Sequence, residues 1–310
     1  MQTTYKRFWR VSKRRTFPVD PRLHASLGRI ESDVAERHLE SRDYWHEKDE
    51  GGLTIFIPNY NHRLFLPRAL RSALDATGIL ERKGIEAEIL VIDDASRDGS
   101  QRLLRDVQAL YSEARLKVIC MERNFGQATL WNVALWASEY RYVLRLDADN
   151  ELLPENLPTF IRAIKGTGAA MVYGNLINIE NGAPSSLVSH MPATFELMRF
   201  NYIDAFSIVD APRIVELGGV RRIHPYTPED RELVLHLIAE EQIIVFVPVI
   251  LGYYHRHAGS ASKELNLTIS GKEALRRVYA QTGLRDWDSE RTGRIYHPDV
   301  GYVDEWWGDA

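Results

Sequence analysis

The chain has 310 residues, of which 45% are hydrophobic, and its 39 basic and 43 acidic residues give a net charge of −4. This composition is typical of a globular protein with a sizeable core, and it lacks the positive charge that a nucleic-acid-binding protein carries. Cys120 is the single cysteine, which excludes an internal disulfide and a multi-cysteine metal site and suits a cytoplasmic protein.

Residues 1–50 are highly charged and end just before Gly51 and Gly52, so we expect an N-terminal appendage there. Its start is basic and aromatic, but no apolar segment of a signal peptide follows. The longest apolar run, 243–251, is shorter than the roughly 20 residues that a membrane-spanning helix needs. We therefore expect a cytoplasmic protein whose basic arm contacts an anionic membrane surface, contacts a second copy in a homodimer, or is solvated.

From residue 53, apolar strands alternate with amphipathic helices. This alternation predicts right-handed crossovers and an α/β fold with a Rossmann-like, mostly parallel sheet covered by helices on both faces. The predicted strands are 53–57, 88–92, 116–120 and 142–146, and the predicted helices are 64–77, 100–111 and 126–137. Cys120 ends the third strand, where we expect it to be a small buried hydrophobic residue.

The second half has a different pattern. Residues 169–182 indicate a strand that turns back on itself, and 206–210 a further short strand, which together predict a small antiparallel extension. A helix at 228–241 and a strand at 243–254 follow. We expect one domain at 51–264, divided into halves 51–150 and 151–264, and a C-terminal tail at 265–310 with a helix at 271–281.

Polar residues follow three of the predicted strands. In open parallel sheets ligands bind beyond the carboxyl ends of the strands, so these residues are candidates for a site. No glycine-rich phosphate loop follows the first strand, which disfavours a dinucleotide-binding fold, a P-loop and a nucleotidyltransferase. The residues are Pro58-Asn59-Tyr60-Asn61, Asp93-Asp94 and Asp147-Ala148-Asp149-Asn150.

Asp147 and Asp149 are spaced by two residues. On an extended backbone they point to the same side, and without a partner their charges repel each other. Mg²⁺ or Mn²⁺ would remove this cost and keep coordination positions open for phosphate oxygens. The pair therefore indicates a metal-bound diphosphate, and a plain turn before a helix starting at Pro154 is the alternative.

Seven short motifs follow one another along the chain: IPNYN (57–61), ILVIDDASRDGS (89–100), NFGQATLWNVAL (124–135), LRLDADN (144–150), Gly218-Gly219, PED (228–230) and HAGSAS (257–262). In this order the chain resembles the inverting family-two glycosyltransferases with the GT-A fold over residues 53 to 262. The resemblance implies metal-dependent transfer of a sugar from a nucleoside-diphosphate sugar, of the UDP or dTDP type, to a hydroxyl of a glycan or glycoconjugate.

On the donor side, the resemblance implies that Tyr60 stacks on the nucleobase and that Asp94 hydrogen-bonds a pyrimidine ring, uracil or thymine. Asp149 is implied to bind the metal directly, and Asp147 to contact the sugar or ribose and to serve as a further candidate metal ligand. A histidine after the last strand approaches the metal, either His257 or, in a shifted register, His255. The remaining residues implied to bind the donor are Pro58, Asn61, Asn124, Gln127 and Asn132.

The resemblance also implies a catalytic base at Asp230, with Glu229 beside it. The same residues read equally as a helix cap, with Thr227 at the N-cap and Pro228 at the first helical position. The two roles are compatible, because the N-terminus of a helix also favours an ionised carboxylate.

One position departs from the family. Many relatives carry an arginine where this chain has Trp131, so the charge of the diphosphate needs another partner. Arg123 or Arg145 could supply it, or either could form a surface ion pair of small energetic value.

Two other functions remain open. A polyprenyl-phosphate glycosyltransferase has an anionic acceptor that needs no base, and the basic arm would help it meet lipid. A non-catalytic relative would bind the sugar nucleotide without transfer, and a rise in melting temperature with UDP and Mn²⁺ would show that binding.

Overall fold

The structure is a computed structural model that describes residues 49–111, 115–193, 201–221, 229–257, 294–297 and 301–304. Nearly all of the expected N-terminal appendage, and the helix expected at 271–281, lie outside these residues. The tail contributes two short antiparallel strands, β10 (Arg294–His297) and β11 (Gly301–Asp304). In the described part of the chain, no helix is long and apolar enough to cross a membrane.

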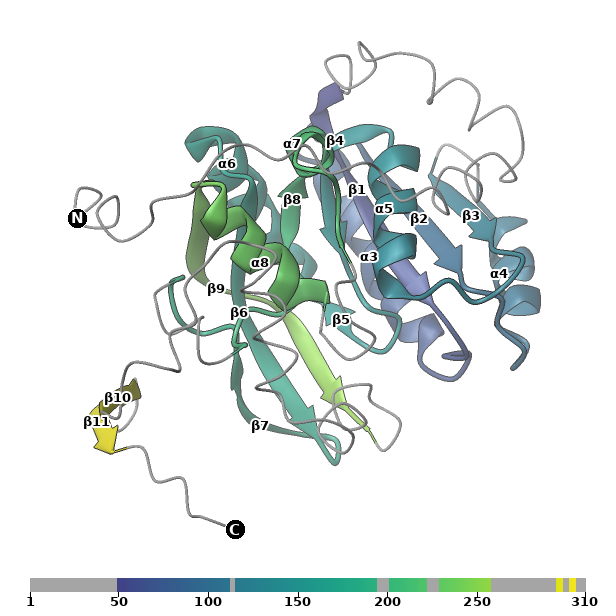
Figure 1. The fold of residues 1–310 in the computed structure, drawn as a ribbon. Helices are drawn as coiled ribbons and strands as arrows, with labels where there is room; N and C mark the ends of the chain where they lie inside the picture. The colour runs from purple at the N-terminus through teal and green to yellow at the C-terminus, as the bar shows by residue number, and fades with distance from the viewer. Residues whose placement is uncertain are drawn as a thin grey trace.

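The first half is a parallel sheet with helical crossovers, as the alternating pattern predicts (Figure 1). Its strands lie in the order β3-β2-β1-β4. The elements are β1 (Asp49–Asn59), α3 (Leu66–Glu81), β2 (Ala87–Asp93), α4 (Ser100–Gln108), β3 (Leu116–Cys120), α5 (Gln127–Ala137) and β4 (Tyr140–Arg145).

The second half continues the same sheet in the order β4-β8-β6-β9-β5, with β7 paired to β6. Strand β8 runs antiparallel to both of its neighbours, β4 and β6, whereas β6 and β9 are parallel. The predicted antiparallel extension is thus confirmed. The elements are β5 (Glu151–Leu152), the 3₁₀ turn η3 (Pro154–Asn156), α6 (Leu157–Thr167), β6 (Met171–Glu180), β7 (Ala183–Val188), β8 (Ile208–Asp210), α7 (Ala211–Glu216), α8 (Glu229–Ala239) and β9 (Ile244–Arg256).

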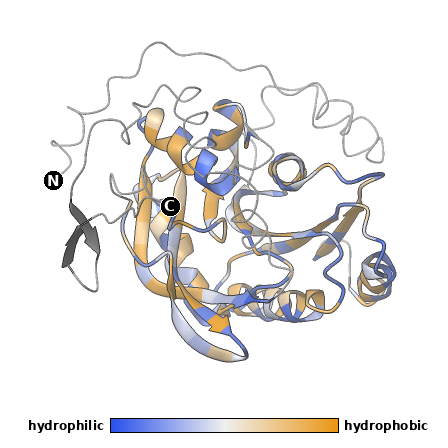
Figure 2. Cartoon of the chain, turned by 60° about the horizontal axis from the view of Figure 1, so that its bottom comes forward, coloured by the Kyte–Doolittle hydropathy of each residue, from blue (hydrophilic) through white to orange (hydrophobic). Residues whose placement is uncertain are grey.

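Two hydrophobic clusters cover the two faces of the sheet. In β1, Leu53, Ile55 and Ile57 belong to the cluster that α3, α4 and α6 cover, while Phe56 belongs to the other. The second cluster is covered by α5, α7 and α8, and Trp131 is its largest fully buried side chain. Figure 2 shows the apolar residues gathered where strands and helices meet. Because both faces are buried, the strands read as nearly continuous apolar runs.

The expectation that Cys120 is buried is wrong. Strand β3 is the outermost strand at its end of the described sheet, and Cys120 is its exposed last residue. A strand at the edge of a sheet has a neighbour on one side only, so an apolar pattern alone does not bury its terminal residue.

Candidate functional site

The carboxyl ends of β1 and β2 are joined by a buried aspartate. Asn59 Nδ2 donates to Asp93 Oδ2 at 2.7 Å, and the backbone nitrogen of Ser96 and Gln101 Nε2 both donate to Asp93 Oδ1 at 2.9 Å. Asp93 is fully buried. Its carboxylate therefore holds the loop after β2 in place, next to Asp94, which is itself 2% exposed.

The loop after β1 presents an aromatic ring to solvent. Tyr60 is 41% exposed, whereas Pro58 before it is buried within the strand. Asn61 has a left-handed backbone with φ 55°, its amide nitrogen donates to Ser96 Oγ at 2.8 Å, and its Oδ1 accepts from the nitrogen of Arg97 at 2.8 Å. Asn61 thus fixes the turn that exposes Tyr60, so a flat base can reach the ring.

Asp94 links β2 to the start of α5. Its Oδ1 accepts from the backbone nitrogen of Phe125 at 2.7 Å and its Oδ2 from that of Gly126 at 2.8 Å. Burial raises the pKa of Asp94 above its ordinary value, and the two backbone bonds oppose that rise. Each carboxylate oxygen can accept a further hydrogen bond, so Asp94 can still bind a ring N–H. Asn124 and Gln127 lie exposed on either side of these amides.

Asp147 and Asp149 do not lie side by side on an extended backbone, so that expectation is wrong. The chain leaves β4 at Arg145 and forms a turn, in which the nitrogen of Asn150 donates to the carbonyl of Asp147 at 2.9 Å. The two carboxylates have different partners. Arg145 Nε donates to Asp147 Oδ1 at 2.8 Å, and His257 Nε2 lies 2.9 Å from Asp149 Oδ2.

Arg145 is a buried cation at the centre of the site, not a surface ion pair. It is 4% exposed and contacts Asp147, Glu229 Oε1 at 3.4 Å and Gln127 Oε1 at 3.1 Å. Its guanidinium lies over the ring of Trp131, 4.7 Å from the centroid. Burial lowers the pKa of a guanidinium, but the two carboxylates outweigh it and hold the pKa of Arg145 above its ordinary value.

Asp149 and His257 lie next to a second histidine that the sequence did not single out. This residue is His62, in the loop after β1. One ring nitrogen of His62, one carboxylate oxygen of Asp149 and one ring nitrogen of His257 all lie within 4.8 Å of one another. Around an ion with octahedral coordination and metal–ligand distances of about 2.1 Å, the ligand atoms lie about 3 to 4 Å from one another. These residues therefore fit a divalent cation after small movements. Asp147 is not part of this group.

Further contacts hold the metal-binding group in place. Arg68 of α3 donates to the backbone carbonyl of Asp149. The nitrogen of His255 donates to Asn150 Oδ1 at 3.0 Å, which ties β9 to the turn after β4. His255 Nε2 itself lies 3.5 Å from Glu151 Oε2. Of the two histidines that the sequence left open, His257 is therefore the one in contact with Asp149.

Asp230 lies in the first turn of α8. Its Oδ1 accepts from the nitrogen of Arg231 at 2.6 Å, and Asn201 Nδ2 donates to both of its oxygens at 3.3 Å. Burial, and then the charge of Glu229, raise the pKa of Asp230 to about 6. This carboxylate is ionised at neutral pH yet can accept a proton. The cap residues Thr227 and Pro228 lie outside the described residues.

Asp204 is a further carboxylate of the site that sequence reasoning missed. It precedes β8, whose start lies at this edge of the sheet because β8 is antiparallel to β4; there the nitrogen of Arg145 donates to the carbonyl of Ser207 at 3.1 Å. The nitrogen of Phe206 donates to Asp204 Oδ1 at 2.9 Å. Burial, and then the charges of Asp147 and Asp230, raise the pKa of Asp204 to about 8.

Replacing Asp204 by asparagine is expected to flatten the dependence of stability on pH. The pKa of Asp204 is about 8 in the folded protein against an ordinary 3.8, so the folded state binds more protons between these values. The stabilisation from this group is complete below pH 3.8 and is lost as the pH rises through about 8. Urea midpoints measured from pH 5 to 9 test this. An unchanged slope in Asp204→Asn would contradict the assignment.

Asn132 does not point into the site with a free amide. Its Nδ2 donates to the carbonyl of Val220 at 2.6 Å, and its Oδ1 accepts from the nitrogen of Val220 at 2.8 Å. This pair of hydrogen bonds attaches α5 to the segment after α7. Gly219 lies under it with φ +77°, and a Cβ there would lie 2.5 Å from Asn132 Oδ1. Within the described structure, Asn132 is therefore a link between the two halves of the domain.

Gly219→Ala is expected to lower the free energy of unfolding by about 2 kcal/mol, because a side chain would both strain the left-handed backbone and displace the amide of Asn132. Urea denaturation measures the change. Gly84→Ala is the matched control: it has φ +69° but nothing within 4 Å of a Cβ, so it carries the backbone strain alone. Equal losses in the two variants would show that the contact with Asn132 has no effect.

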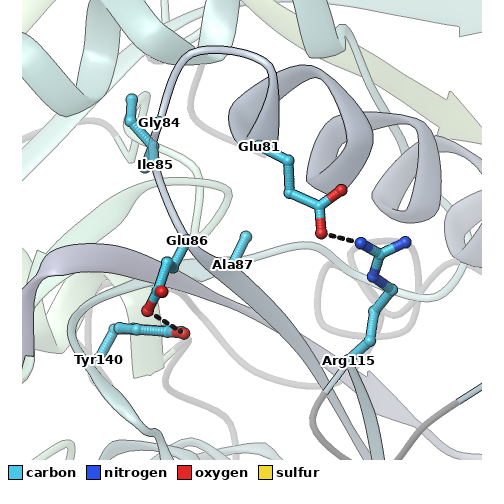
Figure 3. A pocket seen from close by; sticks show the side chains of 7 residues that line it. All are labelled: Glu81, Gly84, Ile85, Glu86, Ala87, Arg115 and Tyr140. Carbon is cyan, nitrogen blue, oxygen red and sulfur yellow. Dashed lines mark hydrogen bonds and ion pairs between the residues drawn. The ribbon is translucent and has the colours of Figure 1, made fainter.

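A cavity of about 610 Å³ opens at the opposite edge of the sheet (Figure 3). It lies at the amino ends of β2 and β4, where Tyr140 Oη donates to Glu86 Oε2 at 3.2 Å and Arg115 pairs with Glu81. The cavity is therefore separate from the residues at the carboxyl ends. Its lining consists of Glu81, Gly84, Ile85, Glu86, Ala87, Arg115 and Tyr140.

Comparison with known families identifies the chain. The model of the family "Glycosyl transferase family 2" matches residues 54–214, which is more than half of the chain and extends from within β1 past β8 into α7. The chain belongs to this family. The family-2 assignment expected from the motifs is thus confirmed.

This family-2 chain is 25% identical over 205 residues to an undecaprenyl-phosphate 4-deoxy-4-formamido-L-arabinose transferase of Pseudomonas fluorescens (strain SBW25). The match covers 66% of this chain but only 54% of that relative, so the chain spans about half of the relative's length.

Solved structures agree with the fold of the family-2 chain. S. aureus TarS 1–349 in complex with UDP-GlcNAc is 16% identical with a TM-score of 0.59, over 75% of this chain and 66% of that one. The mannosyltransferase PcManGT from Pyrobaculum calidifontis, in complex with GDP-Man and Mn²⁺, is 13% identical with a TM-score of 0.52, over 84% and 81%. The GT-A fold predicted from the sequence is therefore confirmed.

Proposed function

We propose that the chain is a metal-dependent, inverting glycosyltransferase that moves a sugar from a UDP or dTDP sugar to a hydroxyl of a glycan or glycoconjugate, in polysaccharide biosynthesis. The observation that carries this proposal is the contact of Asp149 with His257 at the edge of the sheet that also bears Asp94 and Asp230. A nucleotide, a cation and a base thus each have a candidate partner at one edge.

The donor would lie across the ends of β1 and β2. Tyr60 offers its exposed face to the base, and Asp94 an acceptor to a ring N–H. A divalent cation on Asp149 and His257 would neutralise charge on the departing diphosphate. Arg145 lies beside Asp147 and Glu229, so it offsets negative charge that would otherwise repel the donor.

Asp230 would act as the base. The acceptor hydroxyl must lose its proton as it attacks the anomeric carbon on the face opposite the diphosphate, and a carboxylate with a pKa of about 6 can take it at neutral pH. Asn201 holds both oxygens of Asp230 and so fixes their direction. Glu229 does not share this role here, because its carboxylate faces Arg145.

A panel of nucleotide sugars tests the function. Slow hydrolysis needs no acceptor, so we expect release of UDP or dTDP from one donor, dependent on Mn²⁺ or Mg²⁺ and lost with EDTA. The full chain is incubated with each donor, and the released nucleoside diphosphate is quantified. If the protein hydrolyses no donor, and neither UDP nor dTDP with Mn²⁺ raises its melting temperature, the proposed function is wrong.

A polyprenyl-phosphate acceptor is the second candidate, because the relative from Pseudomonas fluorescens is an undecaprenyl-phosphate transferase. An acceptor phosphate is already anionic and needs no base. Asp230→Asn would then retain transfer to polyprenyl phosphate in membrane extracts. Wild-type protein that transfers no sugar to polyprenyl phosphate would favour a hydroxyl acceptor instead.

A further inference from the structure

The metal-binding group of this chain contains two imidazoles. His62 lies in the loop between β1 and α3, Asp149 in the turn after β4, and His257 just beyond β9, so three separate segments supply one ligand atom each. All three side chains are half-buried. Side chains from three segments do not gather within 4.8 Å by local sequence alone, since each segment must be placed by the sheet.

Aromatic packing holds the two imidazoles in place. Phe65 stacks on the ring of His257 with centroids 4.3 Å apart and a 25° angle between planes. The same Phe65 meets the ring of His62 edge-on at 5.9 Å, and the two imidazoles are themselves perpendicular with centroids 5.9 Å apart. One phenyl ring thus orients both candidate ligands toward Asp149.

We infer that His62 is a metal ligand of this chain and that the resulting His-Asp-His set makes the site prefer a first-row transition metal such as Mn²⁺ over Mg²⁺. The inference rests on the proposed function in one respect: it takes Asp149 and His257 as the place where the metal binds. Its chemical reason is that Mg²⁺ binds oxygen ligands almost exclusively, whereas imidazole nitrogen suits the transition metals. Two nitrogens and one carboxylate oxygen are a poor set for Mg²⁺.

The nearby backbone gives the site the rigidity that metal preference needs. Arg68 holds the carbonyl of Asp149, and Asn150 holds the backbone of His255 two residues before His257. Such outer contacts fix the direction of ligands and tune affinity. If the loop after β1 could rearrange, water could take the place of His62 on the metal, and the preference for Mn²⁺ would be lost. Here Phe65 of that loop stacks on His257 and holds the loop in place.

The test measures metal binding directly in the full chain. The electron paramagnetic resonance signal of free Mn²⁺ gives the Mn²⁺ affinity, and displacement by Mg²⁺ gives the Mg²⁺ affinity, each with and without UDP. We expect wild-type protein to bind Mn²⁺ at least tenfold more tightly than Mg²⁺. Because even outer partners of metal ligands change affinity by about 10 to 100-fold, His62→Ala should weaken Mn²⁺ binding at least about tenfold.

Two further variants make the result specific. His62→Asp replaces nitrogen by oxygen and should shift the preference toward Mg²⁺. Leu64→Ala is the matched control, since this side chain of the same loop is 87% exposed and should leave both affinities unchanged. Melting curves without metal show that each variant is folded.

Three outcomes would overturn the inference: wild-type protein that binds no Mn²⁺ with or without UDP, wild-type protein without preference for Mn²⁺, or equal Mn²⁺ affinity in wild type and His62→Ala. The result is independent of sugar transfer. If Mn²⁺ binding depends on His62 but no nucleotide sugar is hydrolysed, the metal site stands and the proposed function fails.

Discussion

Asp230→Asn is expected to abolish sugar transfer while the protein stays folded and binds its nucleotide. An asparagine keeps the shape of the side chain but cannot take a proton. General base catalysis contributes about 10² to 10⁴ in rate, so kcat should fall by about that factor. The measurement is the initial rate of transfer at saturating donor and acceptor, with UDP binding and melting temperature measured on the same sample.

The pH dependence of kcat/KM is a second test of the role of Asp230. Transfer needs the ionised carboxylate, so kcat/KM in the wild type should fall as the pH drops below about 6, where Asp230 gains a proton. Glu241→Gln is a suitable control, because Glu241 is exposed just beyond the opposite end of α8. An active Asp230→Asn protein, or an equal loss in the control, would refute the role of Asp230.

Arg145→Met is expected to lower the free energy of unfolding by about 3 kcal/mol or more. Methionine fills a similar volume against Trp131 but leaves the carboxylates of Asp147 and Glu229 without their cation. Removing one partner of a buried ion pair costs about 3 to 5 kcal/mol, and these carboxylates are partly solvated, so we expect the lower end. Urea denaturation at pH 7 measures it.

Two comparisons separate charge from packing in that experiment. Arg145→Lys keeps the charge but loses the planar fork that contacts three side chains, so its stability should lie between wild type and Arg145→Met. Arg123→Met removes an exposed arginine that lies over Phe125, at a cost of less than about 1 kcal/mol. If Arg145→Met is as stable as wild type, Arg145 does not offset the acids of the site.

Much of the fold could be predicted from the sequence. Strands buried on both faces appear as unbroken apolar runs, and helices appear as apolar residues that recur about every 3.6 residues. The strand 116–120 agrees with β3 residue for residue. The antiparallel extension was predicted, but not that β8 (Ile208–Asp210) pairs directly with β4, since three apolar residues do not show which strand lies beside them. Asp204 was missed because that pairing was not predicted: a residue that precedes a strand antiparallel to β4 lies at the same end of the sheet as the residues that follow β4.

The site was predictable where residues follow a strand directly and not where partners come from distant segments. Asp94, Asp149 and Asp230 became candidates because a family pattern or a strand end marks them. Nothing in the sequence shows that Arg145 is buried, because its strand position looks like that of any charged residue at a strand end. His62 stands in a polar loop, and its place beside Asp149 depends on how β1, β4 and β9 assemble.

The pairing order of the sheet has a consequence for synthesis of the protein. Strand β5 pairs with β9, and β6 also lies along β9, although β9 begins only at Ile244. While the ribosome is still making the residues before β9, these strands lack their neighbour and expose backbone groups. The parallel strands β1 to β4 can assemble earlier. We therefore expect the second half of the domain to fold only after nearly all of it has left the ribosome.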